Sequence, residues 1–183
     1  ALNPPAKVIA EGLSRHLIGA DEALRAKARE VLLGLDDAVA QKSLLAAFAK
    51  AKGALQLELA FATGERGIGD QKVYAYLHHY LETVTENAEK AKVIQSICGK
   101  PDSQQLETYQ SWAKDADRNI AESAFKCLGE VGRPAIDFIT QEIENDFYPN
   151  RLEGVRALGL MGNEYIVPII AKTLFDGDPE IRY

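Results

Sequence analysis

Apolar residues recur along this chain every three to four positions, which is the spacing of amphipathic helices. No segment shows the convincing alternation of a β-strand. The stretch most like a strand covers residues 165–170, but it contains Pro168 in its middle. Proline cannot donate to the hydrogen-bond ladder of a sheet, so this stretch is not predicted to be a β-strand. The pattern therefore predicts an all-α chain.

Residues typical of helix caps mark the expected boundaries. Candidate starts are Asp21, Asp102, Asp117 and Asn150, each before an apolar-periodic segment. Candidate ends are Gly34, Gly129 and Gly159. An Asp or Asn side chain accepts hydrogen bonds from the unpaired N–H groups of a first turn, and a glycine permits the left-handed residue that closes a helix.

The expected glycine stops fall at regular intervals. Gly34, Gly64, Gly99, Gly129 and Gly159 are separated by 30, 35, 30 and 30 residues. A second helix is expected after each of them, over residues 36–50, 70–84, 102–114, 133–145 and 163–175. Two helices per period of about 30 residues predict an α-solenoid of antiparallel helix pairs, with about 11 helices in all.

The sharpest repeat, residues 155–182, carries the motifs of a known family. A helix ends in Ala157-Leu158-Gly159, the next opens with Val167-Pro168, and Asp176-Gly177-Asp178-Pro179-Glu180-Ile181-Arg182 begins a new repeat. This stretch resembles the short HEAT repeat of the phycobilin-lyase type. The resemblance is clearest over residues 117–183, fair over 86–116 and weak over 1–85. It implies a HEAT-like superhelix whose second helices line a concave surface.

We expect one HEAT-like domain over residues 1–183. Residues 1–85 would be degenerate or capping repeats, partly because the segment 64–69 inserts about five residues into the period. Residues 86–183 would be regular repeats. Because residues 178–183 open a further repeat where a solenoid normally has a cap, we expect the chain to be a fragment of a longer one.

Composition and charge narrow the classes of function. Of the 183 residues, 46% are hydrophobic and 26% charged, as in an ordinary soluble globular protein. No apolar run approaches the roughly 20 residues that span a bilayer, so no membrane insertion is expected. Residues 115–183 hold 13 acidic and 7 basic side chains, which accounts for the whole net charge of −6 and argues against a nucleic-acid partner. The absence of a visible signal peptide and the two cysteines suggest a reducing, cytoplasmic location.

Three features contain residues typical of chemical sites, but their spacing favours structural roles for them. Residues 64–69 form a glycine-rich loop that lacks the motif of a phosphate-binding loop. His78 and His79 are adjacent on a helix, so they point about 100° apart and cannot chelate one metal together. Cys98 and Cys127 occupy positions of small buried apolar residues, and sequence alone leaves a disulfide between them open. No catalytic residue, cofactor or metal ligand is therefore predicted.

The expected second helices carry the candidates for partner binding. These are Tyr76, Glu107, Trp112, Asp137, Gln141 and Glu144. In residues 133–145, Ile136, Ile139 and Ile143 form the apolar face, so Asp137, Gln141 and Glu144 turn away from the core. The sequence predicts a protein-interaction scaffold or adaptor that binds a partner protein with a basic segment on this surface. The alternative is an enzyme or enzyme subunit of the bilin-lyase type that acts on a tetrapyrrole chromophore.

Overall fold

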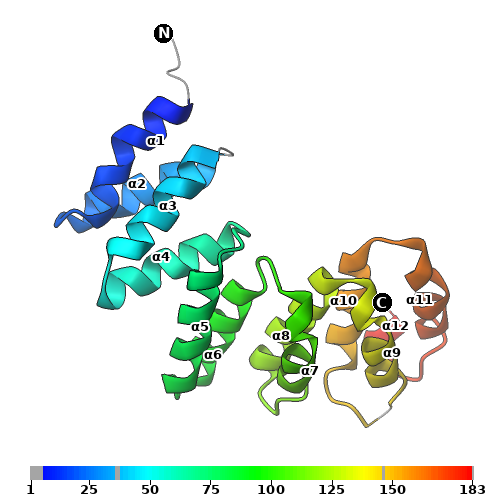
Figure 1. Cartoon of the computed structure of the whole chain (residues 1–183). Helices are drawn as coiled ribbons and strands as arrows, with labels where there is room; N and C mark the ends of the chain where they lie inside the picture. The colour runs from blue at the N-terminus through cyan, green and yellow to red at the C-terminus, as the bar shows by residue number, and fades with distance from the viewer. Residues whose placement is uncertain (1–5, 36–37, 146, 183) are drawn as a thin grey trace. The chain divides into compact units, whose positions relative to one another are not determined.

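The computed structural model describes residues 6–35, 38–145 and 147–182. Its chain divides into two compact units, residues 1–82 and 83–183. Every regular element in the described ranges is an α- or 3-10 helix, and twelve of them are α-helices (Figure 1). The predicted all-α solenoid of helix pairs is confirmed. Each unit is described by itself.

The first unit holds the first five α-helices, and the last residue of the fifth helix, Thr83, is the first residue of the second unit. The helices of the first unit are α1 (Ala6–Ser14), the 3-10 turn η1 (Arg15–Ile18), α2 (Glu22–Gly34), α3 (Ala38–Lys50), α4 (Gly53–Glu65) and α5 (Gln71–Thr83). Helix α3 packs against α1, α2 and α4. Leucines on successive elements are fully buried, and they are Leu17, Leu32, Leu44, Leu59 and Leu77.

The second unit alternates first and second helices. The first helices are α6 (Asn87–Ile97), α8 (Arg118–Val131) and α10 (Arg151–Met161). The second helices are α7 (Leu106–Ala113), α9 (Ile136–Glu144) and α11 (Val167–Thr173), each preceded by a 3-10 turn, namely η2 (Ser103–Gln105), η3 (Arg133–Ala135) and η4 (Glu164–Ile166). A short helix, α12 (Pro179–Arg182), comes last.

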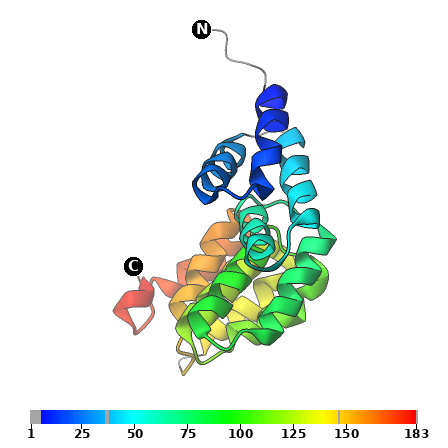
Figure 2. The same cartoon turned by 90° about the vertical axis from the view of Figure 1, so that its left-hand side faces the viewer.

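Stacking in chain order builds the core of the second unit. Helix α8 lies between α6 and α10 and also packs against α7, while α10 packs against α9 (Figures 1 and 2). Tyr109, Phe125, Leu128, Ile139 and Leu158 are fully buried between these helices. Each pair thus covers the apolar side of its neighbour, as the repeat period predicts.

All four predicted helix starts directly precede a helix in the structure, and three of them cap it through the side chain. Asp117 accepts hydrogen bonds from the N–H groups of Asn119 and Ile120, and Asp21 and Asp102 cap their helices in the same way. Asn150 precedes α10 but makes no side-chain cap. Its side chain is buried and hydrogen-bonds Tyr148 instead.

Two predicted helix stops are wrong. Gly129 and Gly159 lie inside α8 and α10, which end two residues later, and the residues that follow these helices are Gly132 and Gly162, with φ of 77° and 58°. Gly129 serves packing: a Cβ there would meet the backbone oxygen of Ala157 at 2.9 Å. The Leu128-Gly129 step therefore marks the close approach of α8 and α10, and the glycine with positive φ, Gly132, comes about one turn later.

Candidate functional site

Three of the predicted partner-binding residues come together in one hollow. Asp137, Gln141 and Glu144 lie on one side of α9 and are exposed, while Ile139 and Ile143 on its other side are buried. The hollow has a volume of about 470 Å³, and its remaining lining residues are Ile136, Thr140, Asn145 and Ile169 of α11. We call these seven residues the acidic hollow.

The charges of the acidic hollow are only partly balanced. The Glu144 carboxylate accepts a hydrogen bond from the Lys172 ammonium of α11 at 3.1 Å, and both side chains are exposed. Asp137 has no ion-pair partner among the residues that the structure describes. The Oγ1 atom of Thr140 is buried and has no hydrogen-bond partner in the same part of the chain. The hollow therefore exposes one carboxylate without an ion-pair partner in the described ranges, that of Asp137, and one that is paired with Lys172.

The other two candidates of the second unit lie on α7. Glu107 is exposed in the first turn of that helix. Trp112 is half-buried, with its ring 5.7 Å from the ring of the fully buried Tyr109. Tyr109 accepts a hydrogen bond from the N–H of Asp102, and burial raises the pKa of its phenol. Trp112 is thus packed against the buried Tyr109 and remains partly exposed.

Tyr76 belongs to the first unit and is more enclosed than the sequence suggests. Its ring meets Phe48 edge-on at 5.5 Å and stacks on Tyr80 at 6.5 Å. The side chain is half-buried, and burial raises the pKa of its phenol. These ring contacts give Tyr76 a packing role within residues 1–82.

The loop after α4 is a helix end rather than a phosphate cradle. The N–H groups of Arg66, Gly67 and Ile68 donate to carbonyls of Ala62, Gly64 and Thr63. Gly67 has a φ of 64°, as in a left-handed helix cap. Since these N–H groups are already used within the chain, they do not converge on a space for an anion.

The histidine pair also takes structural positions. His79 lies 3.4 Å from the carboxylate of Glu82, and both are well exposed. Burial lowers the pKa of His78, and the charge of Glu82 partly opposes this shift. No group of three or more metal-ligating side chains occurs among the described residues.

Sequence reasoning missed a buried polar cluster behind α9. Glu142 is buried, and its carboxylate lies 3.3 Å from the ammonium of Lys114. The hydroxyl of Tyr148 donates to the backbone carbonyl of Ala113. Burial raises the pKa of Tyr148 to about 12, and the hydrogen bond with Asn150 acts against that rise. These contacts join segments up to 35 residues apart, and nothing in the local pattern signals them.

The two cysteines, predicted as small buried residues, are both buried and joined in a disulfide. Their Cα atoms are 4.6 Å apart, and both side chains are fully enclosed. The bond connects the end of α6 to α8, which are consecutive first helices. Disulfides persist in oxidising compartments. Detection of this bond in the native protein would therefore argue against the predicted cytoplasmic location.

No helix in the described ranges is both long and apolar enough to cross a bilayer.

Comparisons with known proteins give a distant likeness. No family model and no curated protein matches the chain. Among solved structures, it is similar to the structure of human deoxyhypusine hydroxylase in complex with glycerol, at 18% identity and a TM-score of 0.45, over 96% of this chain and 70% of that one. The resemblance to HEAT repeats therefore rests on the repeat motifs of the chain and on the stacking of its own helix pairs.

Proposed function

We propose that this chain is a protein-interaction scaffold whose second-helix surface, centred on the acidic hollow, binds a basic segment of a partner protein. One observation carries the proposal. Asp137, Gln141 and Glu144, which the sequence predicts to point away from the apolar face of α9, line a single hollow.

The chemistry of the hollow suits a cationic side chain from a partner. The unpaired carboxylate of Asp137 offers a partner a charge-assisted hydrogen bond, which is stronger than a neutral one. A lysine or arginine of the partner also competes with Lys172 for Glu144, so its gain there is smaller. The aromatic edge of Trp112, on the preceding second helix, supplies the type of anchor that often dominates binding energy.

The test is a charge reversal with a matched control. The double variant Asp137→Lys/Glu144→Lys is compared with wild type and with Glu65→Lys/Glu130→Lys, whose two exposed glutamates lie outside the hollow. Each protein is used to capture partners from native lysate, and captured polypeptides are identified by mass spectrometry. Circular dichroism checks that helicity is equal in the three proteins.

We expect a polypeptide that wild type and control retain and the hollow variant loses. Equal capture by all three proteins would remove the acidic hollow as the binding surface. A purified chain that carries the visible absorbance of a tetrapyrrole, with no captured polypeptide, would favour the bilin-lyase alternative instead.

A further inference from the structure

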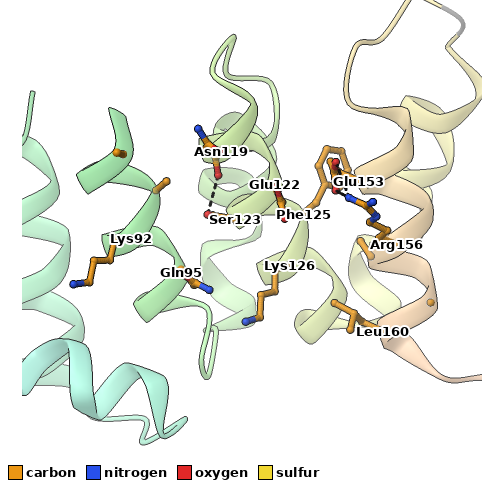
Figure 3. A pocket seen from close by; sticks show the side chains of 14 residues that line it. Lys92, Gln95, Asn119, Glu122, Ser123, Phe125, Lys126, Glu153, Arg156 and Leu160 are labelled. Atoms are coloured by element: carbon orange, nitrogen blue, oxygen red, sulfur yellow. Dashed lines mark hydrogen bonds and ion pairs between the residues drawn. The ribbon is translucent and has the colours of Figure 1, made fainter. Parts of the chain in front are cut away.

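The first helices of the second unit form a separate groove. It runs across α6, α8 and α10 and has a volume of about 820 Å³ (Figure 3). Its floor is apolar and mostly small, with Ala88, Ala91, Phe125, Ala157 and Leu160 among its lining residues. Leu160 is 56% exposed, while Phe125 and Ala157 are buried. We call this feature the first-helix groove.

Each of the three helices contributes one cation to the groove. Lys92 comes from α6, Lys126 from α8 and Arg156 from α10, and all three are exposed (Figure 3). Lys126 and Arg156 are 30 residues apart and so occupy the same position in consecutive repeats. The sequence therefore contains a basic position that repeats on the first helices, although the residues predicted to bind a partner all lie on the second helices.

A buried carboxylate organises the C-terminal part of the groove. Glu153 is 2% exposed, and its oxygens lie 3.0 Å from Arg118 and 2.9 Å from Arg156. The two guanidinium groups remain largely exposed, with side-chain exposures of 65% and 59%. One enclosed carboxylate therefore neutralises two outward-facing cations only in part.

The local charge is opposite to that of the whole chain. Three cations, Lys92, Lys126 and Arg156, line the groove together with two anions, Glu122 and Glu153, so its lining residues carry a net charge of +1. The chain as a whole carries −6. Complementary potentials steer partners and select among them, so a groove of this sign selects for acidic partners.

We propose that the first-helix groove binds an amphipathic helix of a partner protein that carries carboxylates beside an apolar stripe. The small side chains of Ala88 and Ala91 let a helix approach closely, and the exposed side chain of Leu160 meets its apolar stripe. The cations from three successive helices meet its acidic flanks. A phosphate backbone fits less well, because the floor is apolar and Glu122 and Glu153 line the groove. Together with the acidic hollow, the groove would let one unit hold two partners of opposite charge.

The test uses a designed probe. It is a fluorescent, end-capped helical peptide of about 18 residues, five turns long, with a Leu/Ala stripe flanked by Glu. Its matched control replaces every Glu with Lys. Binding to the full chain is measured by fluorescence anisotropy at low and high salt. Variants are Lys92→Glu/Lys126→Glu, which leaves the Glu153 ion pairs intact, and the control Lys52→Glu/Lys72→Glu, whose lysines are exposed in the first unit.

We expect the acidic peptide to bind wild type and the control variant alike. Reversal of Lys92 and Lys126 should raise its Kd about tenfold, because exposed charge pairs contribute modestly each. Added salt should also weaken binding, since it screens these pairs. The Lys-containing peptide should bind more weakly than the acidic one by a similar factor.

Four results would overturn the proposal. They are equal affinity for the two peptides, a Kd unaffected by the Lys92/Lys126 reversal, no binding at millimolar protein, and tighter binding of a single-stranded oligonucleotide of about 20 nucleotides. A concentration-dependent dimer of wild type, abolished by the same reversal in sedimentation experiments, would assign the groove to a second copy of the chain instead.

Discussion

A single methyl group should have opposite effects at two equivalent glycines of the second unit. Gly129 in α8 and Gly159 in α10 are 30 residues apart, and each lies two residues before the end of its helix. A Cβ on Gly129 would meet the Ala157 carbonyl oxygen at 2.9 Å and the Leu160 side chain at 3.3 Å. A Cβ on Gly159 would meet nothing within 4 Å. Both glycines have helical backbones, so the change to alanine gives both the same gain in helix propensity.

The magnitudes follow from two terms. Replacing glycine by alanine within a helix stabilises it by up to about 1 kcal/mol. Overpacking against neighbours that cannot move costs about 1–3 kcal/mol, and the backbone oxygen of Ala157 cannot rotate away as a side chain would. We expect Gly159→Ala to stabilise the unit by about 0.5–1 kcal/mol and Gly129→Ala to destabilise it by up to about 2 kcal/mol. The helix term cancels in the difference between the variants, which leaves the packing term of about 1–3 kcal/mol.

Urea unfolding measures this difference. Circular dichroism at 222 nm follows the helices, and the fluorescence of Trp112, the single tryptophan, reports the second unit because it lies on α7 against α8. Equal slopes in urea for the three proteins would show that the comparison is one of stability. If the two alanine variants shift the midpoint in the same direction and by the same amount, the close approach of α8 and α10 is not as described.

Three further predictions test other parts of the second unit. Leu158→Asp should lower the free energy of unfolding by several kcal/mol and unfold its repeat, because it places a charge at a fully buried position. Trp112 fluorescence and susceptibility to proteolysis measure this loss, and a thermal melt like that of wild type would contradict a core shared between repeats. The protein with the Cys98–Cys127 disulfide should be about 2 Da lighter than its reduced form, because two hydrogens are lost. Since these cysteines are 29 residues apart, reduction should lower the free energy of unfolding by about 3–4 kcal/mol. Free thiols in native protein purified under alkylating conditions would refute the disulfide and favour the predicted cytoplasmic location. Burial raises the pKa of Tyr148 in the folded protein to about 12, above its ordinary value of 10.0, so the contribution of this group to stability is complete below pH 10 and is lost as the pH rises toward 12. Alkaline unfolding of Tyr148→Phe should lack this component, and identical unfolding curves for the variant and wild type would contradict it.

The local features of the fold were open to prediction. Counted together with the 3-10 turns before α7, α9 and α11, the second helices begin and end within about two residues of their expected bounds, because apolar spacing and cap residues act within one or two turns. Asp117 caps α8 through N–H groups two and three residues away, so this contact lies within a short stretch of sequence and can be predicted from it. The outward direction of Asp137, Gln141 and Glu144 follows for the same reason, because the stripe of Ile139 and Ile143 sets the other side of α9.

Other features depend on what lies opposite in space. The same Leu-Gly pair holds a glycine against Ala157 at Leu128-Gly129 and an open glycine at Leu158-Gly159, and only the neighbouring helix distinguishes them. The Cys98–Cys127 disulfide, the burial of Glu153 beneath Arg118 and the contact of Tyr148 with Ala113 join residues 29 to 35 positions apart. Sequence by itself determined the helices, their period and which side of each is apolar, because these depend on neighbours along the chain. Tertiary structure alone decided which glycines are crowded, which charges are enclosed and which side chains share a hollow, because those depend on the distance between helices.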